Sequence, residues 1–217
     1  HIMNTVIYTV QIMNNKQKED TATLEILQVI ENKRDVTQRH LANRLDIALG
    51  LANSYLKRCV HKGLVKIQQV PANRYLYYLT PKGLTEKSRL TAEYLTTSFD
   101  FYRRAGQSLT DIYNDCEQKG IQKILFCGVS ELAEIASLRA QEHKIEIVGT
   151  FDPESTIQSR FIHLPVWTNF KSVGAHDCCL LTALHGSDAL YKLIREYEDD
   201  DNILIPSILG IQNNHNN

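Results

Sequence analysis

Hydrophobic residues in the first third of the chain recur at helical spacing and give way to two short runs of β-formers. The spacing predicts one helix from about residue 21, a second over 37–45 and a third that ends at Lys62-Gly63. Thr37 has the side chain and the position of an N-cap. The expected inner face of the first helix carries Leu24, Leu27, Val29 and Ile30.

The two β-rich runs, at 64–69 and 75–79, are joined by residues 71–74, which suit the tip of a ribbon. The order helix, helix, turn, helix, ribbon is that of a winged helix. Its small core is expected to contain Leu41, Leu45, Ile47, Leu51, Tyr55, Leu56 and Val60.

A long helix is predicted from Pro81 to about Gln118. Apolar or small residues recur along it at alternating spacings of four and three, which is a heptad pattern. They are Leu95, Phe99, Tyr102, Gly106, Leu109, Tyr113 and Cys116. This seam suits a partner helix, so we expect a homodimer through residues 95–116. The alternative is a helix that only covers its own domain.

Strands and helices alternate after Lys119-Gly120. Strands are expected at 123–128, 145–151, 162–167, 178–184 and 203–208, with helices over 131–143 and 187–197. The alternation predicts a doubly wound parallel sheet. A segment of about 90 residues is half the size of a complete dinucleotide-binding domain. The expected fold class is therefore α/β overall, with an N-terminal α+β winged helix and a C-terminal Rossmann-like domain.

A length of 217 residues suits two small domains. We expect an N-terminal tail (1–19), a winged helix (20–81), a linking and dimerising helix (82–118), a Rossmann-like domain (121–211) and a disordered tail (212–217).

Charge separates the two expected domains, although the net charge of the chain is only −1. Residues 1–104 hold 16 Lys and Arg against 9 Asp and Glu, a net of +7, and the remainder holds 8 against 16, a net of −8. This split favours a polyanion as the partner of the first half alone.

Cysteine usage and hydropathy point to the cytoplasm. The five cysteines lie inside apolar patterns, so we expect buried free thiols in a reducing compartment. No apolar run approaches the ~20 residues of a membrane span, and none has the form of a signal peptide.

The third helix is the candidate reader of double-stranded DNA, because a winged helix places the start of this helix in the major groove. Asn53 is the best base reader, since its amide can pair with adenine. Arg39 and Lys57 are expected at phosphates, and Arg74 at the wing tip in or near the minor groove. The full set of DNA-binding candidates is Arg39, Ala48, Leu49, Gly50, Asn53, Ser54, Lys57, Arg58 and Arg74.

Three runs, QRHLANRLDIALG, LKRCVHKGLVKI and YYLTPKGLTEKSRLTAEYL, resemble the MarR-type winged-helix regulators associated with exopolysaccharide and lipopolysaccharide gene clusters. The resemblance covers residues 38–95 and implies transcriptional regulation near surface-polysaccharide or sugar-nucleotide genes. Leu51 and Ala52 stand where more polar residues are common in that family, and the chain carries an extra domain.

Residues 128–133, GVSELA, follow the phosphate fingerprint G-x-G-x-x-G/A with a serine at the second glycine. Gly128 suits the tight turn, and the helix N-terminus offers N–H donors to an anion. Glu131 opposes a phosphate there. Asp152 follows the second strand, where an acidic residue accepts from ribose hydroxyls. Two alternatives stay open, a nucleotide-free scaffold and a ligand site made of Gly128, Val129, Ser130, Glu131 and Asp152.

The runs KILFCGVSELAEIA, IVGTFDP and LPVW resemble the nucleotide-binding N-terminal module of sugar acetyltransferases. The resemblance implies that Gly128, Ser130, Glu131 and Asp152 line a ligand crevice for a sugar nucleotide or a dinucleotide. No hexapeptide repeat follows, so acetyltransferase activity is not implied.

Other reactive groups form no convincing site in the sequence. Cys178-Cys179 fits a buried strand better than a redox pair. Nearby polar residues are expected in loops rather than as metal ligands, and these are His176, Asp177, His185 and Asp188. Since no nucleophilic triad or paired acid and base stands out, we expect neither a catalytic nor a metal site.

These observations together indicate a transcriptional regulator whose Rossmann-like domain senses a nucleotide-type ligand. One alternative is a sugar-nucleotide-handling enzyme or accessory protein that uses its winged helix for protein contacts. Another is an NAD(H) redox sensor.

Overall fold

The computed structural model describes residues 15–33, 36–71, 74–156 and 160–211. The C-terminal tail and positions 72 and 73 of the expected wing tip lie outside this part. The chain divides into two compact units, His1–Ser98 and Phe99–Asn217. None of the described helices has the combination of length and apolar character that crossing a membrane requires.

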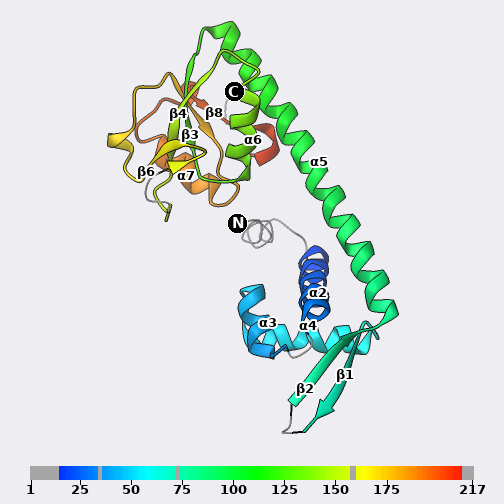
Figure 1. Ribbon diagram of the computed structural model, residues 1–217. Coiled ribbons are helices and arrows are strands. Elements are labelled where there is room, and N and C mark those ends of the chain that lie inside the picture. The colour runs from blue at the N-terminus through cyan, green and yellow to red at the C-terminus, as the bar shows by residue number, and fades with distance from the viewer. Residues whose placement is uncertain (1–14, 34–35, 72–73, 157–159, 212–217) are drawn as a thin grey trace. The chain divides into compact units, whose positions relative to one another are not determined.

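Helices and a hairpin form the first unit (Figure 1). They are α2 (Asn15–Asn32), α3 (Gln38–Leu45), α4 (Leu49–His61), β1 (Val65–Val70) and β2 (Arg74–Leu79), with β1 and β2 antiparallel. Thr37 caps α3, because its side-chain oxygen accepts from the His40 N–H at 3.1 Å. Gly63, with φ +72°, follows the end of α4. The predicted order of elements in the winged helix is confirmed, and so are the predicted start of α3 and the predicted end of α4.

Two details of this unit differ from the prediction. α2 begins at Asn15, so residues 15–19 belong to a helix and not to a tail. Leu51, expected in the core, is 42% exposed, whereas Ala52 is buried. The buried positions of α4 are Ala52, Leu56 and Cys59. Leu51 lies about 100° around the helix from Ala52, and this rotation places it outside the core.

The long helix α5 (Pro81–Lys119) confirms the helix predicted from Pro81 to about Gln118, but its seam has two different environments. Leu95, Phe99 and Tyr102 are between 41% and 58% exposed. Further along, Leu109, Tyr113 and Cys116 are at most 1% exposed and pack into the core of the second unit. The prediction of a partner-helix seam through residue 116 is therefore wrong for this second half.

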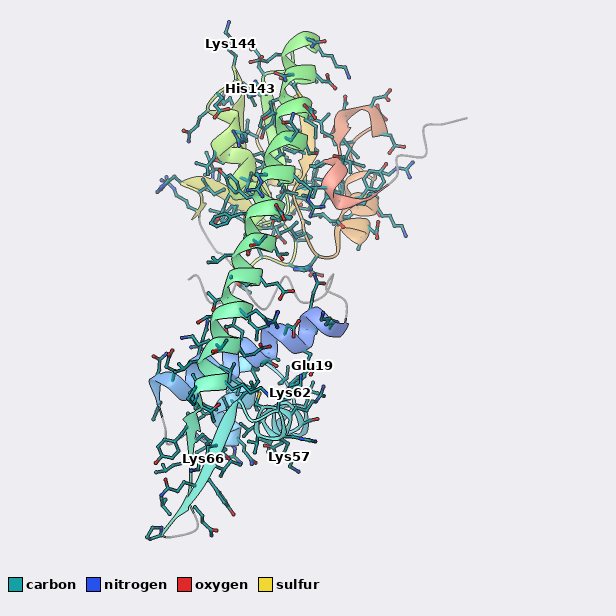
Figure 2. The ribbon with its side chains drawn as sticks, turned by 90° about the vertical axis from the view of Figure 1, so that its right-hand side faces the viewer. Glu19, Lys57, Lys62, Lys66, His143 and Lys144 are labelled. Carbon is teal, nitrogen blue, oxygen red and sulfur yellow. The ribbon has the colours of Figure 1, made fainter. Side chains whose placement is uncertain are left out.

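Hydrogen bonds fasten the end of α5 to the turn after the next helix. The Glu117 carboxylate accepts from the Lys144 N–H at 2.8 Å and lies 3.6 Å from His143 Nδ1. Figure 2 labels His143 and Lys144, which follow α6. Tyr113 donates its hydroxyl hydrogen to the Ala136 carbonyl at 2.9 Å. The last turns of α5 thus form part of the second unit's own layer of helices.

The second unit contains a six-stranded sheet in the order β5-β6-β4-β3-β7-β8. Its elements are β3 (Lys123–Cys127), α6 (Glu131–Ala140), β4 (Glu146–Phe151), β5 (Arg160–Phe161), β6 (Leu164–Trp167), β7 (Cys178–Leu181), α7 (Ser187–Ile194) and β8 (Ile203–Leu204). All pairs are parallel except β5 with β6, which confirms the doubly wound sheet.

The strand predicted at 162–167 is instead part of a hairpin. Ile162 and His163 have φ values of 51° and 65° and form the turn between β5 and β6. Two consecutive positive φ values match the twist of a tight hairpin, although bulky residues rarely adopt them. The strand expected at 203–208 is also shorter and spans only Ile203–Leu204.

Alternate residues of the central strands point to opposite faces of the sheet. Ile124 and Phe126 pack with α5 and α6, whereas Leu125 and Cys127 pack with α7. All five cysteines are buried and free, as predicted. Burial raises the pKa of the Cys59 thiol to about 11, so this thiol stays protonated at neutral pH.

Candidate functional site

α4 presents one row of outward positions, made of Gly50, Ser54, Lys57 and His61. Their spacing of four, three and four keeps them on one side of the helix. The opposite side is held in the core by Ala52, Leu56 and Cys59. Packing therefore decides which side of α4 remains available to a partner.

Basic side chains around α4 differ in how firmly they are held. Lys57 and Arg39 are exposed, and no ion pair joins either to a residue in the described part of the chain. Arg58 lies 2.9 Å from the Glu19 carboxylate. Lys62 lies 3.2 Å from the same carboxylate, and Figure 2 labels both Glu19 and Lys62. Exposed ion pairs contribute less than about 1 kcal/mol, so a phosphate can replace Glu19.

The expected base readers are not equally placed. Ala48, Leu49 and Gly50 are exposed as predicted, and Ser54 accepts a 3.5 Å hydrogen bond from Arg58. Asn53 lies beside the row and is half buried. Its Oδ1 atom is buried without a hydrogen-bond partner in the described part of the chain.

The wing adds residues that the sequence analysis did not select. Lys66 lies on β1, where residues 66–69 are all exposed (Figure 2). Its signal in the sequence was a lysine inside an otherwise β-forming run. Arg74 is the first residue of β2, and its side chain lies outside the described part of the structure.

The Gly128 turn lies at the carboxyl end of β3. Because β3 is flanked by β4 on one side and β7 on the other, the strand order reverses here, and α/β folds bind ligands at such a point. Gly128 has φ +109°, and a Cβ at this position would lie 2.5 Å from the Cβ of Ala183. Sheet packing alone thus requires glycine at this position.

The polar groups of this turn form hydrogen bonds with one another and with the end of β7. The Val129 N–H donates to Asp152 Oδ2 at 2.8 Å, and the Leu132 N–H donates to Ser130 Oγ at 3.0 Å. The Ser130 hydroxyl donates to the carbonyl of Thr182, whose own hydroxyl donates to the Gly128 carbonyl at 2.6 Å. Ser130 is therefore the N-cap of α6 and a tie to the end of β7, and these donors are not free for a pyrophosphate.

Carboxylates also surround the start of α6. Glu131 is half buried in its first turn, and burial together with Glu131 raises the pKa of Glu134. Negative charge here opposes a phosphate. Asp152 accepts a second bond, from the Glu154 N–H at 3.0 Å. Since each carboxylate oxygen can accept two hydrogen bonds, Asp152 can still receive a hydroxyl. The structure thus brings Gly128, Val129, Ser130 and Asp152 together.

Comparison with known proteins found a match for the part of the chain that contains the first of these two sites. A family model described as a winged helix-turn-helix DNA-binding domain matches residues 19–66. No curated protein sequence matches the chain. Residues 19–66, which include α3, α4 and most of α2, are therefore similar to winged helix-turn-helix DNA-binding domains.

Similar solved structures include two bacterial regulators and one human enzyme. MepR, a transcription regulator of a Staphylococcus aureus multidrug efflux pump, is 17% identical with a TM-score of 0.33, over 46% of this chain and 72% of MepR. The zinc-responsive MarR family member ZitR of Lactococcus lactis is 20% identical with a TM-score of 0.34, over 56% of this chain and 74% of ZitR.

Human N-acetylserotonin methyltransferase in complex with SAM is 13% identical with a TM-score of 0.33, over 91% of this chain and 76% of the enzyme. All of these scores are low, so the identification of the DNA-binding domain rests on the family match and on the geometry of α4.

Proposed function

We propose that this protein is a cytoplasmic, DNA-binding transcriptional regulator of the MarR type. The exposed row of α4, inside a matched winged helix, is the observation that carries the proposal. Ala48, Leu49, Gly50 and Ser54 face base edges in the major groove, and Asn53 reaches a base after its amide rotates outward. Phosphates are bound by Arg39, Lys57, Arg58 and Arg74.

Binding to a labelled DNA duplex over a range of salt concentrations tests this proposal. We expect a steep fall in affinity with salt, and a slope smaller by about two when Arg39 and Lys57 are both replaced by alanine. The matched control is Lys144→Ala, which removes an exposed lysine from the second unit. The proposal fails if the duplex does not bind at low salt, or if the control lowers the slope equally.

The proposed regulator is a homodimer that pairs through the exposed part of α5. Leu95, Phe99 and Tyr102 keep the heptad spacing of four and three and are all substantially exposed. Two operator half-sites require two winged helices, which is the physical reason for pairing. The part of the range 95–116 that is buried in the second unit does not take part.

Light scattering of the full chain after size exclusion tests the dimer. Phe99→Glu places a charge in the seam, so we expect it to give monomers. Leu138→Glu is the control, because Leu138 is 53% exposed on α6 and lies outside the seam. A Phe99→Glu protein that stays dimeric excludes this seam.

The second unit is proposed to sense a nucleotide-type ligand, with a sugar nucleotide favoured, and so to regulate surface-polysaccharide or sugar-nucleotide genes. The support is the position of Asp152 beside the Gly128 turn, at the reversal of strand order. Because the Val129 and Leu132 N–H groups are occupied, the sugar hydroxyls and not the phosphates are the groups bound at this turn.

Thermal unfolding with UDP-sugars, CMP-sugars, NAD(H) and acetyl-CoA tests ligand binding. A rise in Tm for one of these with the wild type, lost in Asp152→Ala, supports the proposal. No rise with any of them leaves the DNA-binding proposal intact and removes the sensing part. Opposite effects of NAD⁺ and NADH on DNA affinity would instead favour a redox sensor.

A further inference from the structure

Three potential metal ligands from separate segments of the second unit converge beside β7. His176 precedes β7, Cys179 lies within it and Glu198 follows α7. Their ligand atoms all lie within 4.8 Å of one another. The sequence could not show this, since Glu198 is nineteen positions beyond Cys179 and only the fold joins them.

The distances between these atoms suit a tetrahedral metal ion. Cys179 Sγ lies 3.6 Å from His176 Nε2, and His176 Nε2 lies 3.3 Å from Glu198 Oε1. Zinc bonds of about 2.3 Å to sulfur and about 2.1 Å to nitrogen or oxygen, at tetrahedral angles, separate the same atom pairs by about 3.6 Å and about 3.4 Å. Both separations need almost no movement of the side chains.

The histidine ring is already oriented for a metal ion. His176 Nδ1 lies 2.8 Å from the Gly174 carbonyl, which can only accept, so Nδ1 carries a proton and Nε2 is the ring atom that faces Cys179 and Glu198. A backbone carbonyl that binds the other ring nitrogen is the usual second partner of a metal-ligating histidine.

Phe170 holds the surroundings of the ring in place. It lies in the short 3₁₀ helix η2 (Phe170–Ser172), and its ring is nearly perpendicular to the His176 ring at a centroid distance of 6.0 Å. The Phe170 ring also stacks on Tyr197, the residue before Glu198, at a centroid distance of 4.8 Å.

Burial and access also suit a bound ion. Cys179 is fully buried, whereas the side chains of His176 and Glu198 are 9% and 21% exposed. Burial around Cys179 limits competition from water for the ion, and the partly exposed Glu198 gives the ion a path from the solvent. A neutral imidazole, a thiolate and a carboxylate carry two negative charges, which one divalent cation neutralises.

We propose that His176, Cys179 and Glu198 form a binding site for one divalent transition-metal ion of the zinc class. The combination of sulfur, nitrogen and oxygen ligands favours zinc or cobalt over the hard cations magnesium and calcium. Three protein ligands leave one position of the tetrahedron open. A bound ion ties β7 to the segment after α7 and is independent of DNA binding by the first unit.

Titration of the chelator-treated, reduced full chain with cobalt and with zinc tests the site. We expect one cobalt ion per chain, with a thiolate-to-cobalt charge-transfer band, and a rise in Tm on adding zinc but not magnesium. Cys179→Ser abolishes the band. Glu198→Gln, at a partly exposed position, weakens zinc binding about tenfold or more.

Two control variants distinguish this site from adventitious binding. Cys178→Ser alters the adjacent buried cysteine, whose side chain is on the opposite face of the sheet, and His143→Gln removes another mostly buried histidine. Both should bind metal like the wild type. Absence of saturable binding, a band that survives Cys179→Ser, or equal losses in the controls would show a hydrogen-bonded cluster only.

Discussion

The sequence marks two regions as binding sites, α4 and the Gly128 turn, and the structure gives them opposite characters. Along α4, Gly50 and Lys57 are exposed, and nothing in the described part of the chain holds Lys57 in an ion pair. At the Gly128 turn, Val129, Ser130 and Asp152 are bonded to one another or to the neighbouring strand end.

The difference shows that a sequence motif can reflect either the folding of a turn or the binding of a partner. A glycine and a capping serine after a strand are needed to build the strand-to-helix turn, whether or not a ligand binds there. An exposed row of basic and small residues contributes nothing comparable to folding. Exposed side chains that no hydrogen bond or ion pair holds within the described part of the chain therefore indicate a binding surface more strongly than the turn motif does.

Substitution of glycine in the two regions should give the largest contrast. Gly128→Val forces a Cβ against Ala183 at a left-handed φ, and we expect the free energy of unfolding to fall by about 3 kcal/mol or more. Gly50→Ala meets nothing within 4 Å and should raise it by about 0.5–1 kcal/mol. Urea denaturation followed by circular dichroism measures both, and equal effects would remove the contrast.

Asp152→Asn should destabilise the protein by about 2 kcal/mol, because the charged acceptor of the Val129 and Glu154 N–H groups is lost. Asp115→Asn is the control, since Asp115 is exposed on α5. Urea midpoints compare the two variants. If they coincide, the bonds at the turn contribute nothing and its donors are available to a ligand.

Lys57→Ala should weaken binding to duplex DNA about fivefold at low salt, without changing the urea midpoint. The corresponding Lys62→Ala should have a smaller effect on affinity, because Lys62 already pairs with Glu19. Fluorescence anisotropy with a labelled duplex measures both. A larger effect at Lys62 would mean that freedom from internal partners does not identify the contact.

Asn53→Ala should lower the free energy of unfolding by less than about 0.5 kcal/mol, because the buried Oδ1 has no hydrogen bond within the described part of the chain to lose. A drop of 1 kcal/mol or more in the free energy of unfolding would show that Asn53 is structural. Competition between duplexes of different sequence then tests whether the variant has lost discrimination among bases.

Local sequence signals were sufficient for most of the architecture. The N-cap at Thr37, the glycine after α4 and the 39-residue α5 follow from capping chemistry and from hydrophobic period. The alternation of strands and helices after residue 120 likewise determined the parallel sheet. These features depend on residues within a few positions of one another, which is why they can be predicted from sequence.

Tertiary packing decided what local patterns leave open. Leu109 and Leu95 share one heptad seam, yet Leu109 is buried in the core between α5, α6 and the sheet, whereas Leu95 is exposed, because the second unit covers only part of α5. The turn at Ile162 and His163 uses residues that carry no turn signal.

The residues on their own predicted that α4 faces DNA, which stays a prediction, and that Gly128 forms a turn after a strand, which the structure confirms. Only the fold showed that Asp152 accepts from the Val129 N–H of that turn and that Glu198 lies close to His176 and Cys179. Contacts between residues far apart in the chain depend on how the sheet and the helices pack. The hydrophobic period and the local spacing of residues do not determine that packing.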